Sequence, residues 1–281
     1  MSYSSNLTDG NSVLVVAHGD DELLWFEPLI AAARCIIVAG TPVGQSRATR
    51  MRQIYESWGP YGKKFIYFPL GVVSDQEWVA QRTNNCASDA NINSEAQVTN
   101  ALRPYLTALK NQGCTRIISH NIWGEYGHPN HRVVSVATRT LGLELGYDVW
   151  RDSVIHTNGT SPLPTGKYLE ALFLNGVTYS AQYTFNSTDF QQYRQLYKDV
   201  IVSTVKPDGS PFVDDLWTWN EGANEWPTGN RKYWREVLDG KSLLVTNATL
   251  FDQVLKIRGD RAWPAGSQYA AYVAPKYYTC P

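Results

Sequence analysis

The segment SVLVVAHGDDE, residues 12–22, gives the clearest indication of the fold. Its first six residues form a valine-rich, mainly apolar run that is too short for a helix, so they predict a buried strand. The acidic residues that follow begin a pattern of helical spacing over residues 21–33. A strand that passes into a helix through ionisable side chains is typical of a ligand site at the carboxyl end of a parallel strand.

The same rhythm of apolar runs and helical patterns continues through the first half of the chain. Further strands are expected at residues 35–39, 65–70 and 116–120. Further helices are expected at residues 45–58, 94–110 (with Ser94 as the N-cap) and 131–145. This alternation predicts the α/β class, with a Rossmann-like, mostly parallel sheet and helices on both faces.

The composition excludes several classes of protein. The 281 residues include 25 basic and 26 acidic side chains, so the net charge of -1 gives no long-range attraction to nucleic acid. No run approaches the roughly 20 apolar residues that a transmembrane helix needs. No signal peptide is visible near the N-terminus, so a soluble protein is expected, either cytoplasmic or secreted. The oligomeric state is left open.

The four cysteines form no C-x-x-C motif of the kind that binds zinc or supports redox exchange. Cys35 and Cys114 stand just before apolar runs and are expected in the core. Cys86 and Cys280 lie in polar or terminal segments, and a disulfide between them is neither predicted nor excluded.

Beyond about residue 150 turn residues become frequent and aromatic side chains concentrate. Five aromatic residues fall within eighteen positions, namely Trp217, Trp219, Trp226, Tyr233 and Trp234. We expect them in an aromatic-rich C-terminal cap, with residues 151–281 completing the core of residues 1–150 in one continuous domain. The aromatic side chains either stack on a substrate or pack the cap onto the core.

The first segment that points to chemistry is AHGDDE, residues 17–22. His18 and Asp21 are three positions apart at a predicted helix start, so both side chains can face one point. An imidazole and a carboxylate that converge in this way suit a divalent metal such as zinc. An isolated acidic cluster at a helix start, however, also serves simply to complement the helix dipole.

The second segment is GEYGHPNH, residues 124–131, after the predicted strand 116–120. Pro129 suits the first position of a helix, which puts His128 at the cap and His131 in the first turn. Because both segments follow parallel strands, we expect them at the same edge of the sheet. We infer a metal site formed by His18, Asp21 and His131, with Asp20 and His128 beside it and one coordination position open.

Together the two segments resemble the LmbE-like (PIG-L) family of zinc-dependent N-deacetylases, whose motifs are A-H-P-D-D-E and G-H-P-D-H or G-H-x-N-H. The resemblance covers roughly the first 150 residues. Gly19 replaces the usual proline, and Asn130 replaces the aspartate that some members use to orient a catalytic histidine. The resemblance implies one zinc ion per chain, although the ligand set would also accept other first-row metals.

The resemblance also implies roles for individual residues. His18, Asp21 and His131 would be the zinc ligands. Asp20 would be the general base, His128 the acid or oxyanion stabiliser, and Tyr126 a further contact to the tetrahedral intermediate. Substrate contacts are expected from Arg47, which could instead be a solvated helix charge, and from Trp217, Trp219 and Trp226.

The expected activity is removal of an acyl group from an N-acylated glucosamine in a larger conjugate. Among members of this family, the sequence as a whole most resembles the deacetylases of glycopeptide-antibiotic biosynthesis. A glycolipid is the other substrate class that we consider. The alternative is a metal-containing carbohydrate-binding protein without catalysis, which would have no need of Asp20 or His128. The acyl chain and the aglycone are not predicted.

Overall fold

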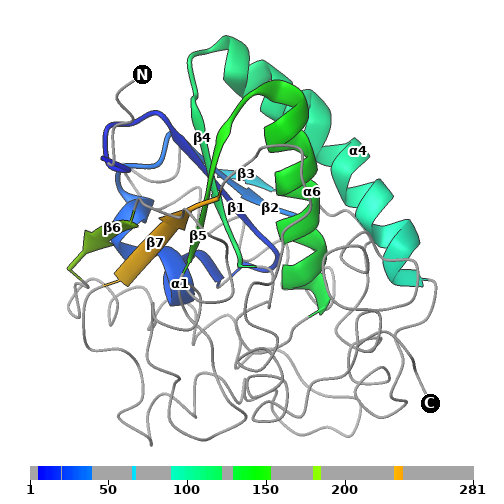
Figure 1. Ribbon diagram of the computed structural model, residues 1–281, viewed down its shortest axis with the longest axis horizontal. Helices are drawn as coiled ribbons and strands as arrows, with labels where there is room; N and C mark the ends of the chain where they lie inside the picture. The colour runs from blue at the N-terminus through cyan, green and yellow to red at the C-terminus, as the bar shows by residue number, and fades with distance from the viewer. Residues whose placement is uncertain are drawn as a thin grey trace, which may run out of the picture.

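The computed structural model describes residues 6–19, 21–39, 65–67, 90–121, 129–152, 180–184 and 231–236 of the chain. Within these residues seven strands form one sheet in the order β3-β2-β1-β4-β5-β7-β6 (Figure 1). The strands are β1 (Ser12–Val16), β2 (Cys35–Val38), β3 (Phe65–Tyr67), β4 (Arg116–Ser119), β5 (Asp148–Asp152), β6 (Ser180–Tyr183) and β7 (Arg231–Arg235). The helices are α1 (Asp21–Ile30), α4 (Ala90–Asn111) and α6 (Pro129–Leu145).

The sheet is mixed. Strands β3, β2, β1, β4 and β5 pair in parallel, and β1 lies in the middle, with Val13 opposite Cys35 on one side and Ile117 on the other. Strands β7 and β6 extend this sheet in antiparallel pairings beyond β5. The α/β class predicted from the sequence is confirmed.

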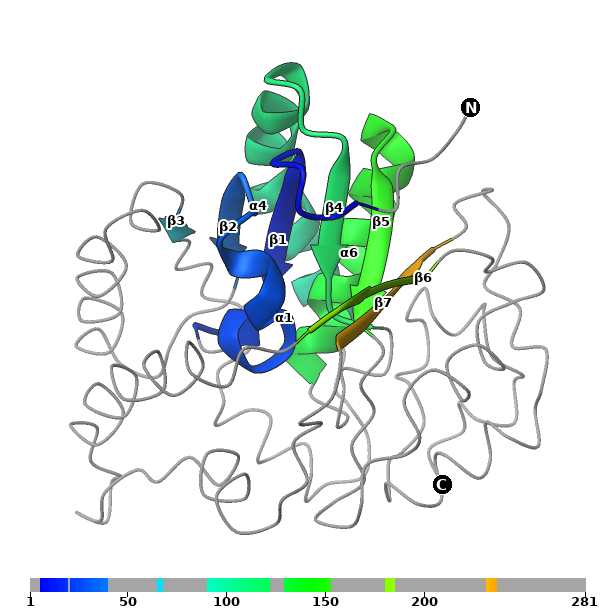
Figure 2. The same cartoon turned by 90° about the vertical axis from the view of Figure 1, so that its left-hand side faces the viewer.

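Strand β1 is buried on both faces, which explains its continuous apolar sequence. Val13 and Val15 belong to the core cluster under α4 and α6, whereas Leu14 and Val16, which alternate with them, are equally buried toward the opposite face. Figure 2 shows α4 and α6 behind the sheet and α1 in front of it. The described helices therefore cover both faces.

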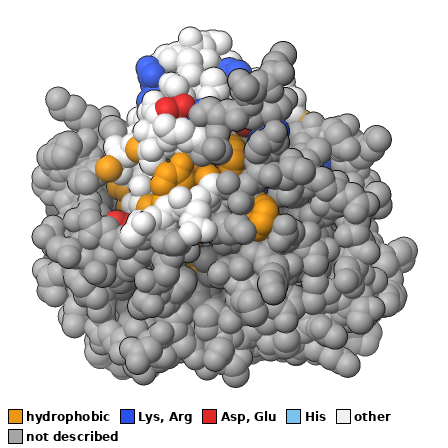
Figure 3. Space-filling model, turned by 60° about the vertical axis from the view of Figure 1, so that its left-hand side comes forward, with side chains coloured by type: hydrophobic (Ala, Val, Ile, Leu, Met, Phe, Trp, Pro, Cys, Tyr) orange, Lys and Arg blue, Asp and Glu red, His pale blue; other side chains and the backbone are white. Residues whose placement is uncertain are grey.

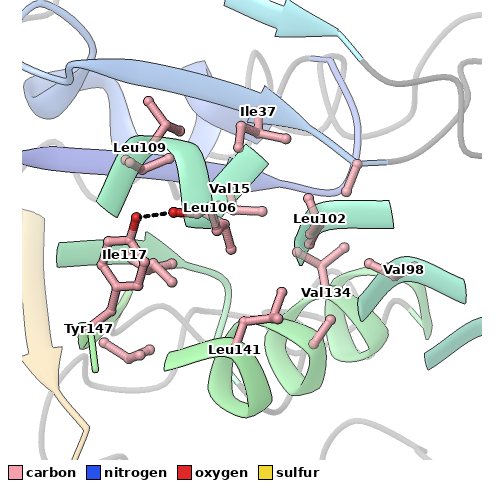
Figure 4. Close-up of a cluster of buried hydrophobic side chains, with 14 of the residues drawn as sticks. Val15, Ile37, Val98, Leu102, Leu106, Leu109, Ile117, Val134, Leu141 and Tyr147 are labelled. Carbon is pink, nitrogen blue, oxygen red and sulfur yellow. Dashed lines mark hydrogen bonds between the residues drawn. The ribbon is translucent and has the colours of Figure 1, made fainter. Parts of the chain in front are cut away.

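The core under α4 and α6 contains one polar group that is satisfied internally (Figure 4). The Tyr147 hydroxyl donates a hydrogen bond of 2.6 Å to the carbonyl oxygen of Leu106. Cys35 and Cys114 lie in the same cluster as free thiols, as the sequence predicts. Burial raises the pKa of the Cys35 thiol to about 12, so it is a packing residue and not a nucleophile.

Both long helices end on a glycine in the left-handed region, Gly113 after α4 and Gly146 after α6. The amide N–H groups of Cys114 and Tyr147 then reach back to carbonyl oxygens five residues earlier, at 3.0 Å in each case. These are Schellman-type ends, and they turn the chain sharply into β4 and β5. Helix α4 begins at Ala90, so the expectation that Ser94 caps this helix is wrong: Ser94 lies inside it.

The order of the strands creates a natural site between β1 and β4. From β1 the chain moves outward to β2 and β3, and it then resumes at β4 on the other side of β1. Where strand order reverses in this way, the loops after the two central strands diverge and leave a crevice at their carboxyl ends. His18 and Asp21 follow β1, and His120 follows β4, so all three lie at this crevice.

Two of the five aromatic residues that were expected in a C-terminal cap lie in the sheet instead. Tyr233 and Trp234 are in β7 and are buried in the sheet, not in a cap. The Tyr233 ring stacks on Phe26 at 6.0 Å, and its hydroxyl donates to the carbonyl oxygen of Trp25. These two aromatic residues are therefore part of the sheet and its core, which differs from both roles that the sequence suggested for a cap.

One side of the described part carries both apolar and charged side chains. Figure 3 shows a band of apolar side chains, with lysine and arginine side chains gathered above it. Large apolar side chains that are exposed within the described residues are Tyr105 and Leu143, on α4 and α6. None of the described helices is both long and apolar enough to cross a bilayer.

Candidate metal centre

Three side chains from the two sequence segments meet at the carboxyl ends of β1 and β4. One ligand atom each from His18, Asp21 and His131 lies within 4.8 Å of the others. His18 Nδ1 is 3.2 Å from His131 Nε2 and 3.4 Å from Asp21 Oδ2. His131 Nε2 is 3.2 Å from Asp21 Oδ1. All three residues are buried.

The spacing of these atoms fits a tetrahedral metal ion. Zinc bonds of about 2.0–2.2 Å place the donor atoms of a tetrahedron about 3.3–3.6 Å apart. The separation of 3.2 Å between His18 Nδ1 and His131 Nε2 is close to these values. Asp21 approaches the two histidines through different carboxylate oxygens, and one donor atom of each of the three residues lies within 4.8 Å of the others. Two imidazoles and one carboxylate are also a donor set of catalytic zinc sites, and three protein ligands leave a fourth position for water or substrate.

Asp21 is held in place by its own surroundings. It is the first residue of α1, and its Oδ2 accepts a hydrogen bond of 2.6 Å from the His18 N–H, which closes the loop between them. Its Oδ1 accepts from Trp25 Nε1 at 3.2 Å, one helical turn further on. Burial alone raises the pKa of the Asp21 carboxyl, but the imidazoles of His131 and His120 lower it well below its ordinary value. The carboxylate form is the one that a metal requires.

His120 belongs to the same cluster and was not singled out from the sequence. It is fully buried directly after β4, and its ring stacks on His131 with centroids 4.0 Å apart. Its Nε2 accepts a hydrogen bond of 3.0 Å from the Ala17 N–H. Nε2 also lies 3.3 Å from Asp21 Oδ2, and His120 is not one of the three residues whose donor atoms converge, so we assign it to the support of Asp21 and His131 and not to the ligands. An ionisable residue at the end of a buried parallel strand is the sequence signal that could have revealed it.

Asn130 lies on the other side of His18. Its side-chain amide nitrogen is 3.0 Å from His18 Nε2, and the residue is buried in the first turn of α6. Helix α6 begins at Pro129, the position that the sequence favoured for the start of this helix. The start of α6 therefore supplies both His131 and a polar contact to His18.

A buried ionic network holds the backbone of His120, directly after β4. Arg151 of β5 donates from Nε to Glu236 Oε2 at 2.8 Å and from Nη1 to the His120 carbonyl oxygen at 3.1 Å. Arg139 of α6 forms an ion pair with the same Glu236 carboxylate. The network ties β5, α6 and the residue after β7 to the backbone of His120.

Several residues named in the sequence analysis lie outside the part of the chain that the structure describes. They are Asp20, Arg47, Cys86, Tyr126, His128, Trp217, Trp219, Trp226 and Cys280. The expected helix at residues 45–58 also lies outside it. The structure therefore places His18, Asp21 and His131 close together, and the roles of all the named residues remain predictions.

Comparisons with known proteins give no family assignment. No protein-family model matches the chain, and no curated protein matches it. Among solved structures, the chain is similar to a deacetylase from the biosynthesis pathway of teicoplanin, with a TM-score of 0.46, 16% identity, and coverage of 80% of this chain and 97% of that one.

Two further solved structures give similar values. A pseudoaglycone deacetylase of the antimicrobial A40926 has a TM-score of 0.45 and 14% identity, over 81% of this chain and 97% of that one. The zinc-inhibited form of teicoplanin deacetylase has a TM-score of 0.46 and 15% identity, over 80% and 97%. Likeness of this degree does not establish an activity for the present chain.

Proposed function

We propose that this chain is a zinc-dependent N-deacylase that hydrolyses the amide of an N-acylated glucosamine within a larger conjugate. The observation that supports the proposal is the buried group of His18, Asp21 and His131, in which one donor atom of each residue lies within 4.8 Å of the others. In this proposal residues 1–150 supply the metal-binding catalytic core. Residues 151–281 complete the core and contribute the substrate-binding cap.

Amide hydrolysis at neutral pH needs an activated water molecule and a stabilised oxyanion. A zinc ion held by His18, Asp21 and His131 would lower the pKa of a water molecule to about 7 and polarise the acyl carbonyl group. The burial of the three residues supports such a role, because electrostatic stabilisation is stronger where water is excluded.

Three residues would then move protons and stabilise charge. Asp20, which precedes the ligand Asp21 in the chain, would accept the proton of the attacking water. His128 would donate a proton to the leaving amine, and Tyr126 would donate a hydrogen bond to the oxyanion. These roles are those that the resemblance of the two motifs to the LmbE-like family implies.

The substrate class is proposed from composition and sequence. A net charge of -1 favours a neutral or mixed substrate over a polyanion. Trp217, Trp219 and Trp226 would hold a sugar ring or a bulky apolar group, and Arg47 would contact the conjugate. A glycopeptide antibiotic or a glycolipid that carries an N-acyl-glucosamine meets these requirements.

The experiment that tests the proposal measures carboxylate release from N-acetylglucosamine, a long-chain N-acyl-glucosamine lipid and an N-acyl-glucosaminyl glycopeptide. We expect release from at least one of them, loss of release with a chelator, and recovery on addition of zinc. Substituting His18→Ala should remove both zinc and activity. Asp20→Asn should retain zinc while its rate falls about 10²–10⁴-fold, the range of general acid–base catalysis.

The exposed variant Glu144→Gln serves as a control and should behave as wild type. Release that is insensitive to the chelator would contradict metal-dependent hydrolysis. Sugar binding without turnover in the presence of zinc would favour a carbohydrate-binding protein. Full activity of Asp20→Asn would remove Asp20 as the base.

A further inference from the structure

The two ring nitrogens of His18 face different neighbours. Nδ1 points toward His131 Nε2 and Asp21 Oδ2, at 3.2 and 3.4 Å, which is the side on which a metal would bind. Nε2 lies 3.0 Å from the side-chain amide of Asn130. All four residues are buried, so protein groups and not bulk water decide where the ring carries its proton.

The position of that proton decides whether His18 can bind a metal. A neutral imidazole has one N–H and one lone pair. Ligation through Nδ1 requires the lone pair there, so the proton must be on Nε2, which then needs a hydrogen-bond acceptor. When the NH₂ of Asn130 faces Nε2, as in this structure, Nε2 must accept and the proton is on Nδ1.

The tautomer with its proton on Nδ1 allows hydrogen bonds within the group of His18, Asp21 and His131 without a metal ion. With its proton on Nδ1, His18 can donate toward Asp21 or His131 across the separations of 3.2–3.4 Å. A half-turn of the Asn130 amide would exchange NH₂ for oxygen at nearly the same place. The amide oxygen would then accept from Nε2–H and free the Nδ1 lone pair.

We propose that Asn130 is a positioning residue whose amide orientation selects the tautomer of His18 and so converts this histidine between a hydrogen-bond donor and a metal ligand. The inference rests on the proposed function only in taking His18, Asp21 and His131 as the ligands. An asparagine can serve both tautomers, because it has a donor and an acceptor on one planar group. An aspartate at the same position would only accept, and it would hold the ligand tautomer permanently.

Two substitutions of Asn130 should have opposite effects on zinc binding. Asn130→Asp keeps the shape of the side chain and should bind zinc at least as tightly as wild type. Asn130→Leu removes the acceptor and should weaken zinc binding about 10- to 100-fold, as is usual when a partner of a ligating histidine is lost. Asn100→Asp, on the exposed surface of α4, is the control for added negative charge and should leave zinc affinity unchanged.

The test combines zinc affinity, measured by chelator competition, with ¹⁵N NMR of histidine-labelled protein. In the absence of metal, we expect the Nδ1–H form of His18 in wild type and the Nε2–H form in Asn130→Asp. Zinc should convert wild type to the Nε2–H form. Unchanged zinc affinity in Asn130→Leu, equal weakening in Asn130→Asp, or the same metal-free tautomer in wild type and Asn130→Asp would overturn the inference.

The comparison without metal keeps this test separate from the proposed function. If wild type binds no zinc, the proposed function fails, but the two metal-free spectra still decide whether Asn130 selects the tautomer. If wild type binds zinc and His18 has the same tautomer in wild type and in Asn130→Asp, the deacylase proposal stands and the proposed role of Asn130 is refuted. Should Asn130→Leu fail to fold, the isosteric Asn130→Asp carries the test.

Discussion

The substitution Glu236→Gln removes the shared anion of the buried network behind the metal site. The Glu236 carboxylate forms ion pairs with Arg139 and with Arg151, the latter through Nε at 2.8 Å and Nη2 at 2.7 Å. All three side chains are at least nine-tenths buried. A glutamine would leave two buried guanidinium groups facing a neutral amide, whose NH₂ cannot accept from them.

The magnitude follows from burial. Two unit charges 4 Å apart interact by about 4 kcal/mol at an effective dielectric constant of about 20. Breaking a buried pair by removing one partner costs about 3–5 kcal/mol, because the other charge stays buried. We therefore expect Glu236→Gln to lower the free energy of unfolding by about 3–5 kcal/mol, a large part of the roughly 5–15 kcal/mol typical of a folded domain.

Equilibrium unfolding in urea, followed by tryptophan fluorescence and by circular dichroism, measures this loss. The matched control is Glu144→Gln, which makes the same chemical change in the Arg103–Glu144 pair, where both side chains are more than one-third exposed. Water solvates those charges, so we expect little change in the urea midpoint. If Glu236→Gln shifts the midpoint no more than Glu144→Gln does, the buried charges do not hold β5, β7 and α6 together, and the reasoning is refuted.

Two further predictions concern pH and the support of the site. Hydrogen bonds from Arg116 lower the pKa of Asp9 in the folded protein, so its contribution to stability is complete above the ordinary value of 3.8 and is lost as pH falls through the lower folded value. Urea unfolding should therefore show wild type more stable than Asp9→Asn near pH 6, with the difference shrinking below pH 3.8; a difference that grew with acidity would contradict this. His120→Phe keeps an aromatic ring beside His131 but leaves the Ala17 N–H without its acceptor, at a cost of about 1–3 kcal/mol in the free energy of unfolding. It should also weaken zinc binding measured by chelator competition, whereas wild-type affinity would show that His120 only fills space.

The strands that could be predicted from the sequence are those with short, mainly apolar runs of residues. Strands β1, β2 and β4 lie in the middle of the sheet and have the short apolar runs that such burial requires. Strands β5 and β7, with the sequences DVWRD and RKYWR, have the charges of a surface segment. They are tolerated in the sheet because partners far along the chain satisfy those charges; Arg151 and Glu236 are 85 positions apart. No local pattern contains that information.

The same distinction applies to the site. His18 and Asp21 are three residues apart, and their contact depends on one helix start, so the sequence could bring them together. His131 required the added assumption that the ends of parallel strands meet at one edge. The place of His120 at the end of a buried strand could be noticed in the sequence, but its partner could not, because its bond to Ala17 joins residues 103 positions apart. The contact between Asn130 and His18 arises in the same way, from the docking of α6 beside β1.

The central claim is that His18, Asp21 and His131 bind one zinc ion. A crystal of the zinc-loaded protein, measured on both sides of the zinc absorption edge, tests it most directly. We expect one anomalous peak per chain, about 2.0–2.2 Å from His18 Nδ1, a carboxylate oxygen of Asp21 and His131 Nε2. A peak at other residues, or the absence of a peak between these three side chains at saturating zinc, would contradict it.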